Sequence, residues 1–143
     1  MNNWHRIATG LVLLSVVWAR SDPLDSWAVR IPGVAGSTLG IVKRENGRFI
    51  TVGSGGGLLT SIDGIAWVSE QSGTDRWLDN ITYGNGIFVI VGEDGTILTS
   101  PDFASWTAQS PVTASELNSI IYTNNQFVAV GQTGTILTSP DGF

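Results

Sequence analysis

The chain has 143 residues, 42% of them hydrophobic and 13% charged, which fits one globular domain and leaves little room for a second. Its formal net charge is −5 and its few basic residues form no stripe, which excludes a surface built to neutralise nucleic-acid phosphates. It has no cysteine, so disulfides, thiol catalysis and thiolate metal sites are excluded together.

The N-terminus has the layout of a secretory signal peptide. His5 and Arg6 make the start of the chain basic, and residues 7–19 form an apolar run. The small residues at the end of this run suit cleavage by signal peptidase. We therefore expect residues 1–19 to be a signal peptide and residues 20–26 a short N-terminal segment, which predicts an exported protein, periplasmic or extracellular. A membrane anchor is the alternative, but the apolar run is shorter than the roughly 20 residues that span a bilayer.

A sequence repeat with a period of 39 residues occupies the rest of the chain. From Leu39 onward the copies align without an insertion. The recurring positions are Leu39, Leu78 and Leu117; Phe49, Phe88 and Phe127; Val52, Val91 and Val130; Gly53, Gly92 and Gly131; and Asp63, Asp102 and Asp141. We divide residues 27–143 into three units, about 27–66, 67–105 and 106–143.

Each unit contains four short segments rich in β-branched and aromatic residues, separated by turns with Gly, Asn or Asp. In chain order the expected elements are strands at 67–70, 78–83, 87–92, 96–100 and 106–109, with turns at 84–86 and 94–95. Residues 27–30 resemble the strand at 67–70. Lys43 and Arg44 are neighbours in a strand, so their side chains point to opposite faces and we interpret them as ordinary surface charges.

Four antiparallel strands per unit form one blade of a β-propeller, and blades stack to bury both faces. The sequence therefore predicts an all-β fold, a partial β-propeller of three four-stranded antiparallel blades. A solenoid-like β-stack is the alternative, although units of this length are longer than β-helix turns. Propellers have about four to eight blades. Three blades therefore indicate either a truncated array or a homo-oligomer that completes the ring.

A Ser-x-Asp turn follows the third strand of every unit, with a Trp six residues after the Ser in the first two copies. These residues are Ser61, Asp63 and Trp67; Ser100, Asp102 and Trp106; and Ser139 and Asp141. The motif resembles the Asp-box, or bacterial neuraminidase repeat, of a β-propeller superfamily, and the chain is most similar to exported bacterial repeat proteins and photosystem II assembly factor-like propellers. The resemblance implies that the motif marks the turn between the third and fourth strands. We expect a structural role, because an active site is needed once and not three times.

No catalytic constellation is evident, and neither a cofactor nor a metal is expected. His5 is the only histidine and leaves with the predicted signal peptide. Acidic residues in or near loops could serve as glycosidase acids, but we interpret them as solvated acids of turns. They are Asp75, Asp79, Glu93, Asp94 and Glu116.

The leading functional hypothesis is a non-enzymatic, exported propeller that acts as an interaction or scaffold module. Its possible binding loops carry Trp77, Glu93 and Asp94, and its partner is a protein or a glycan. Trp77 is either exposed for stacking or packed. The alternative is a carbohydrate-binding or sialidase-like protein with an incomplete site. The resemblance implies three substrate-binding arginines for a sialidase, whereas the repeats contain only Arg30, Arg44, Arg48 and Arg76, with almost none in the last two blades.

Overall fold

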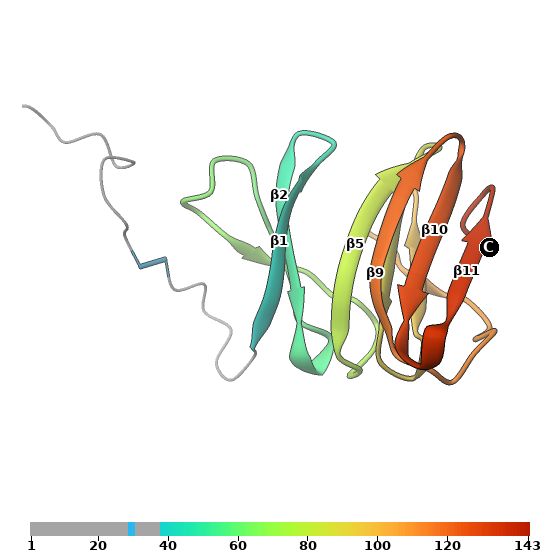
Figure 1. Cartoon of the computed structure of the whole chain (residues 1–143). Coiled ribbons are helices and arrows are strands. Elements are labelled where there is room, and N and C mark those ends of the chain that lie inside the picture. Colours follow the sequence, from blue (N-terminus) through green and yellow to red (C-terminus); the bar gives the residue numbers. More distant parts are fainter. Residues whose placement is uncertain (1–28, 31–37) are drawn as a thin grey trace, which may run out of the picture.

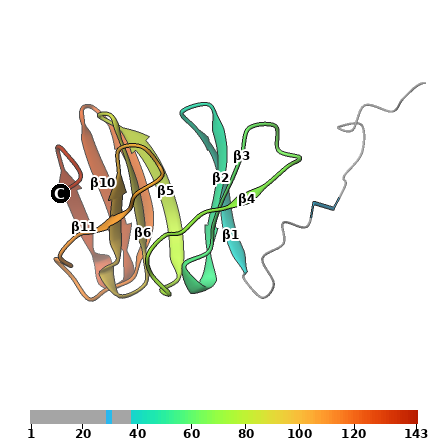
Figure 2. The same cartoon turned by 180° about the vertical axis from the view of Figure 1, so that it is seen from behind.

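The computed structural model describes residues 29–30 and 38–143, which form three antiparallel β-sheets side by side (Figures 1 and 2). The all-β fold and the three blade-like sheets are confirmed. The predicted signal peptide, residues 1–19, and the segment 20–26 lie outside the described residues. Val29 and Arg30, the described end of the strand-like segment 27–30, belong to no strand in this chain.

The strands of each sheet are hydrogen-bonded in chain order, as in a propeller blade. The first sheet contains β1 (Leu39–Glu45), β2 (Arg48–Gly53), β3 (Leu58–Ser61) and β4 (Val68–Ser69). The second contains β5 (Leu78–Gly84), β6 (Ile87–Gly92), β7 (Ile97–Ser100) and β8 (Thr107–Ala108). The third contains β9 (Leu117–Thr123), β10 (Gln126–Gly131) and β11 (Ile136–Ser139). Within the described residues the third sheet thus has three strands, where four were expected.

The fourth strands are also shorter than predicted, with two residues each instead of four. In the first sheet, Trp67 stands just outside β4, and its indole Nε1 donates a hydrogen bond to the Gly64 carbonyl of the preceding turn, at 3.2 Å. Beyond β4 a single backbone bond continues the pairing, from Glu70 N to Leu58 O at 2.8 Å. The equivalent bond in the second sheet runs from Gln109 N to Ile97 O, at 2.9 Å.

The second turn of every blade is a single 3₁₀ turn and not the two-residue hairpin that the sequence predicted at 94–95. These turns are η1 (Ser54–Gly56), η2 (Glu93–Gly95) and η3 (Gln132–Gly134). In η2 the N–H of Glu93 donates to the carbonyl of Trp77, just before β5, at 2.9 Å. A Cβ added at the adjacent Gly92 would lie 2.1 Å from that same oxygen. The repeat keeps glycine here because the start of the first strand crosses directly over the end of the second.

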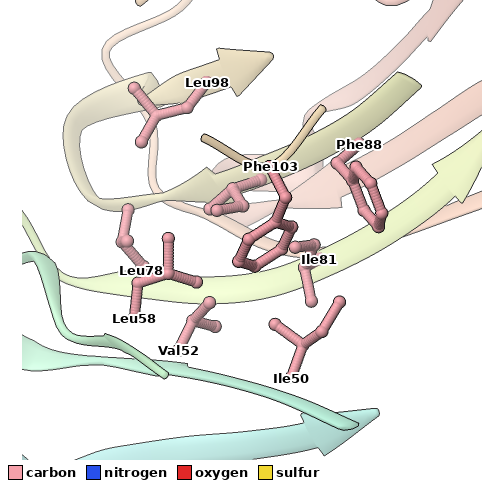
Figure 3. Close-up of a cluster of buried hydrophobic side chains, with 9 residues drawn as sticks. Ile50, Val52, Leu58, Leu78, Ile81, Phe88, Leu98 and Phe103 are labelled. Carbon is pink, nitrogen blue, oxygen red and sulfur yellow. The ribbon is translucent and has the colours of Figure 1, made fainter. Parts of the chain in front are cut away.

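Two hydrophobic clusters fill the spaces between the sheets. Figure 3 shows the first, where Ile50, Val52 and Leu58 of the first sheet meet side chains of the second. Strand β6 serves both clusters, since Phe88 and Ile90 point toward the first sheet while Val89 and Val91 pack on the third. A strand buried on both faces explains why its sequence is apolar without alternation. The second sheet is therefore the sandwiched blade that the sequence predicted.

The first strands of the three sheets, β1, β5 and β9, are neighbours (Figure 1). Lys43 on β1 reaches along this edge, and its Nζ donates to the carbonyl oxygen of Ile120 on β9 at 3.4 Å. Burial lowers the pKa of Lys43, while the charge of Glu45 acts in the opposite direction. Lys43 is therefore half-buried and links the sheets, which corrects its interpretation as an ordinary surface charge.

Candidate functional site

The corner after β3 is held by its own serine and aspartate. Ser61 Oγ accepts a hydrogen bond from Gly64 N at 2.8 Å and donates to Asp63 Oδ1 at 3.0 Å. The same carboxylate oxygen accepts bonds from the backbone N–H groups of Ile65 and Ala66, at 2.8 and 2.9 Å. These backbone bonds, together with that from the Ser61 hydroxyl, lower the pKa of Asp63. The carboxylate is thus engaged by its own loop.

The other two corners repeat this pattern. Asp102 Oδ1 accepts bonds from the backbone N–H groups of Ala104 and Ser105, at 2.9 and 3.1 Å, which lower the pKa of Asp102. In the third corner Ser139 Oγ donates to Asp141 Oδ1 at 3.0 Å. All three acidic side chains therefore stabilise turns. A group that is used in the same way three times is poorly suited to be the one catalytic acid of an enzyme.

The second corner differs from the first in its aromatic packing. Phe103 takes the place of Gly64 in a left-handed backbone conformation, with φ 69°. Its buried ring packs edge-on against Phe88 and Trp106, with centroids 5.0 and 5.2 Å apart. Trp106 Nε1 is buried without a hydrogen-bond partner, whereas Trp67 uses the same atom to bind the turn. Trp106 thus contributes packing where Trp67 contributes a polar bond.

The three residues predicted to lie in binding loops are brought together beside η2. Trp77 N donates to Glu93 Oε2 at 3.1 Å, and Glu93 N donates back to the Trp77 carbonyl at 2.9 Å. The guanidinium of Arg76 pairs with the Asp94 carboxylate. Trp77 is 38% exposed, so it is neither fully packed nor free. We call Arg76, Trp77, Glu93 and Asp94 the Trp77 surface.

The Trp77 surface lies at the boundary between the first two sheets and occurs once. A Cβ at Gly40 of β1 would lie 4.0 Å from Trp77 Nε1, which places the indole against the neighbouring sheet. The residues equivalent to Trp77 in the other repeats are Thr38 and Glu116. Because its side chain is not required by every blade, Trp77 is a better candidate for recognition than the recurring corner residues.

Asp79 is a residue whose environment the sequence did not reveal. It lies in β5 at an irregularity in the pairing with β6, and its Oδ2 is buried without a partner. Burial, and to a smaller extent the charges of Glu116 and Glu93, raise the pKa of Asp79 to about 6. The interpretation of Asp79 as a solvated acid is therefore wrong. Its position at the start of a strand was the available signal.

Two further observations concern only the described residues. Within residues 29–30 and 38–143, no three His, Asp or Glu side chains are placed to hold a metal ion. In the same part of the chain, no helix has the length and apolar character needed to cross a membrane.

Comparison with known proteins places the fold. No protein-family model matches the chain, and no curated protein is similar to it in sequence. The solved structure of YCF48 from Cyanidioschyzon merolae, a β-propeller protein, matches this chain with a TM-score of 0.62 and 20% sequence identity. The match covers 74% of this chain and 35% of YCF48, so the chain spans about a third of that protein's length. This likeness shows a propeller-type fold for the three sheets.

Proposed function

We propose that this chain is a non-enzymatic propeller that acts as an interaction or scaffold module, with a protein as its partner. The observation that carries the proposal is the contrast between the corners and the Trp77 surface. The recurring aspartates bind their own backbone, whereas Trp77 is a half-exposed aromatic that only the middle repeat possesses. Its resemblance to photosystem II assembly factor-like propellers also favours a scaffold role.

The Trp77 surface has the composition of a protein-binding site. An amphipathic aromatic ring surrounded by charged groups is typical of the residues that dominate protein interfaces. Two hydrogen bonds hold the backbone of Trp77 in place before binding, one to the Glu93 carboxylate and one from the Glu93 N–H. This reduces the entropy that a partner must overcome. The ion pair of Arg76 with Asp94 leaves Glu93 as an acidic neighbour of the ring.

Export is part of the proposal and is supported by the N-terminal sequence. The basic start and the apolar run of residues 7–19 fit a signal peptide. We expect the mature protein in a periplasmic or extracellular fraction, with an N-terminus that follows residue 19 closely. N-terminal sequencing of the fractionated protein measures this, and a retained leader in the cytoplasmic fraction would contradict it.

The interaction is tested by cross-linking the tagged chain in its native host and identifying the captured proteins. Trp77→Ala should abolish capture of a specific partner, because truncation of a central interface aromatic weakens binding by about 2 kcal/mol or more, roughly thirtyfold. Val112→Ala, at another exposed apolar side chain, is the matched control and should capture the partner normally. Equal capture by both variants would remove the Trp77 surface from the proposal.

The carbohydrate-active alternative is tested separately with fluorogenic glycosides, sialosides included, and with a glycan array. We expect neither turnover nor glycan binding. Turnover that disappears in Glu93→Gln or Asp79→Asn would show that the protein is an enzyme. Array binding that is lost in Trp77→Ala, without turnover, would replace the protein partner by a glycan.

A further inference from the structure

The third sheet exposes a face that the other two sheets bury. Ile136 on β11 is 68% exposed, whereas its repeat equivalent Leu58 is 1% exposed in the first hydrophobic cluster. Val130 on β10 is likewise exposed, while its equivalents Val52 and Val91 are fully buried. We define the open face by its apolar residues Ile121, Val128, Val130 and Ile136. Among the described residues no segment covers it (Figure 1).

The first sheet has the complementary exposed face on its opposite side. Val42 on β1 is 59% exposed, whereas its equivalent Ile81 is fully buried against the preceding sheet. Leu39 is also exposed, while its equivalents Leu78 and Leu117 are buried. A shallow groove of about 430 Å³ runs over this side between Leu39, Val42 and Trp67. We call it the Val42 face.

The two junctions inside the chain show how such faces meet. Ile81 of the second sheet and Leu58 of the first lie in one hydrophobic cluster. In the next junction Ile120 packs in the cluster against which Ile97 lies. Ile81 and Ile120 are equivalents of Val42, and Leu58 and Ile97 are equivalents of Ile136. The same geometry would therefore place a Val42 face on an open face, apolar against apolar.

We propose that two copies of this chain assemble head to tail, the Val42 face of each covering the open face of the other. The internal junctions indicate that the open face is covered by a second copy. In each junction a sheet covers the preceding sheet with the repeat positions that the Val42 face exposes on the first sheet. Two copies supply six sheets, within the range of about four to eight blades found in propellers. A head-to-tail contact forms a finite assembly only if its rotation closes, and a propeller ring provides that closure. The inference goes beyond the proposed function and does not depend on the Trp77 surface.

Sedimentation velocity of the full chain over a hundredfold concentration range tests the assembly. We expect a species of twice the mass of the sedimented chain, which is 15.2 kDa when all 143 residues are present. Ile136→Glu and Val42→Lys should each raise the dimer dissociation constant at least thirtyfold, because each places a charge in both apolar junctions. Ile62→Glu changes an exposed apolar residue that does not line the groove of the Val42 face, and should leave the dimer intact.

Mixing the two variants is the decisive experiment. An equimolar mixture of Ile136→Glu and Val42→Lys should recover a dimer, since one junction then joins two unaltered faces and the other opposes a glutamate to a lysine. Both substitutions change exposed side chains, so each variant should fold. Far-UV circular dichroism of each variant checks this. A monomeric wild-type chain, an open-ended series of larger species, or a mixture that stays monomeric would each overturn the proposal. A monomer that binds a hydrophobic dye, with the signal lost in Ile136→Glu, would assign the open face to a different occupant.

Discussion

Phe103 occupies a left-handed backbone conformation in a corner where the other two repeats have Gly64 and Gly142. That conformation costs an L-residue about 1–2 kcal/mol relative to a right-handed one. The ring nevertheless fills the space between Phe88 and Trp106, and burial of a phenylalanine is worth more than that cost. Packing between sheets therefore determines the residue at this turn.

Replacing Phe103 separates the two effects. Phe103→Ala should lower the free energy of unfolding by about 3–5 kcal/mol, because it leaves a cavity while the backbone strain stays the same. Phe103→Gly should be about 1 kcal/mol more stable than Phe103→Ala, because glycine adopts positive φ without strain. Urea unfolding of both variants measures the difference. If Phe103→Gly proves no more stable than Phe103→Ala, backbone strain contributes nothing at this position.

Asp79 should make stability fall as the pH rises. Its pKa in the folded protein, about 6, lies above the ordinary value of 3.8, so the folded state binds more protons than the unfolded state between these pH values. This contribution to stability is fully present below about pH 3.8 and is lost as the pH rises through about 6. Asp79→Asn, the residue found at the equivalent position 118, should raise the melting temperature at pH 7 and flatten the profile.

The control for this experiment is Asp75→Asn, which removes the same charge from an exposed position four residues earlier. Thermal melts of both variants between pH 4 and pH 8 give the profiles. An Asp79→Asn profile that parallels that of the unaltered chain would show that the Asp79 carboxyl does not titrate with folding. The corner aspartates act with the opposite sign, because the pKa of Asp63 is lowered and its contribution is lost on acidification.

The glycine at the end of β5 decides how closely the second and third sheets approach. A Cβ added at Gly84 would lie 2.0 Å from the ring of Tyr122 on β9. Gly84→Ala should therefore destabilise the protein by about 1–3 kcal/mol through overpacking. Gly40→Ala is the matched control, since a Cβ there finds only ordinary contacts and no positive φ. Chemical denaturation measures both, and equal stabilities of the two variants would show that Tyr122 moves aside freely.

The sequence predicted the strands well where the pattern is local. Strand β6 was predicted at its observed limits, because β-branched residues run between two turns. The fourth strands were predicted too long, because the extent of their pairing with the third strands depends on how the corner folds back. The environments of Lys43 and Asp79 were missed for a related reason. Both depend on neighbouring sheets, and a pattern within one repeat carries no information about them.

The three sheets differ in how completely they are covered. Strands β6 and β10 each lie between two strands of their own sheet, but β6 is buried on both faces and β10 on one. In repeat proteins stability is shared between units and their junctions, so a junction on each side protects a sheet most. Backbone amides of residues 88–91 should therefore exchange with deuterium at least tenfold more slowly than those of residues 127–130 in dilute protein.

Hydrogen exchange at rising protein concentration then reports on the whole assembly. If a second copy covers the open face, protection of residues 127–130 should increase with concentration and approach that of residues 88–91. Residues 88–91, already covered on both faces, serve as the internal reference. Exchange that is uniform across the two segments in dilute protein would contradict a difference in coverage.

The crossing of Trp77 over Gly92 affects how the number of repeats in the gene can change. In each repeat the residue before the first strand contacts the glycine that ends the second, 15 positions later, so the contact lies within one unit. Unequal recombination that adds or removes 39 codons therefore keeps every such crossing intact, wherever the breakpoints fall relative to the repeat. A single-codon insertion between Trp77 and Gly92 would shift the glycine away from its oxygen. This contact therefore penalises insertions between the two positions it joins, whereas gain or loss of a whole blade leaves it unchanged.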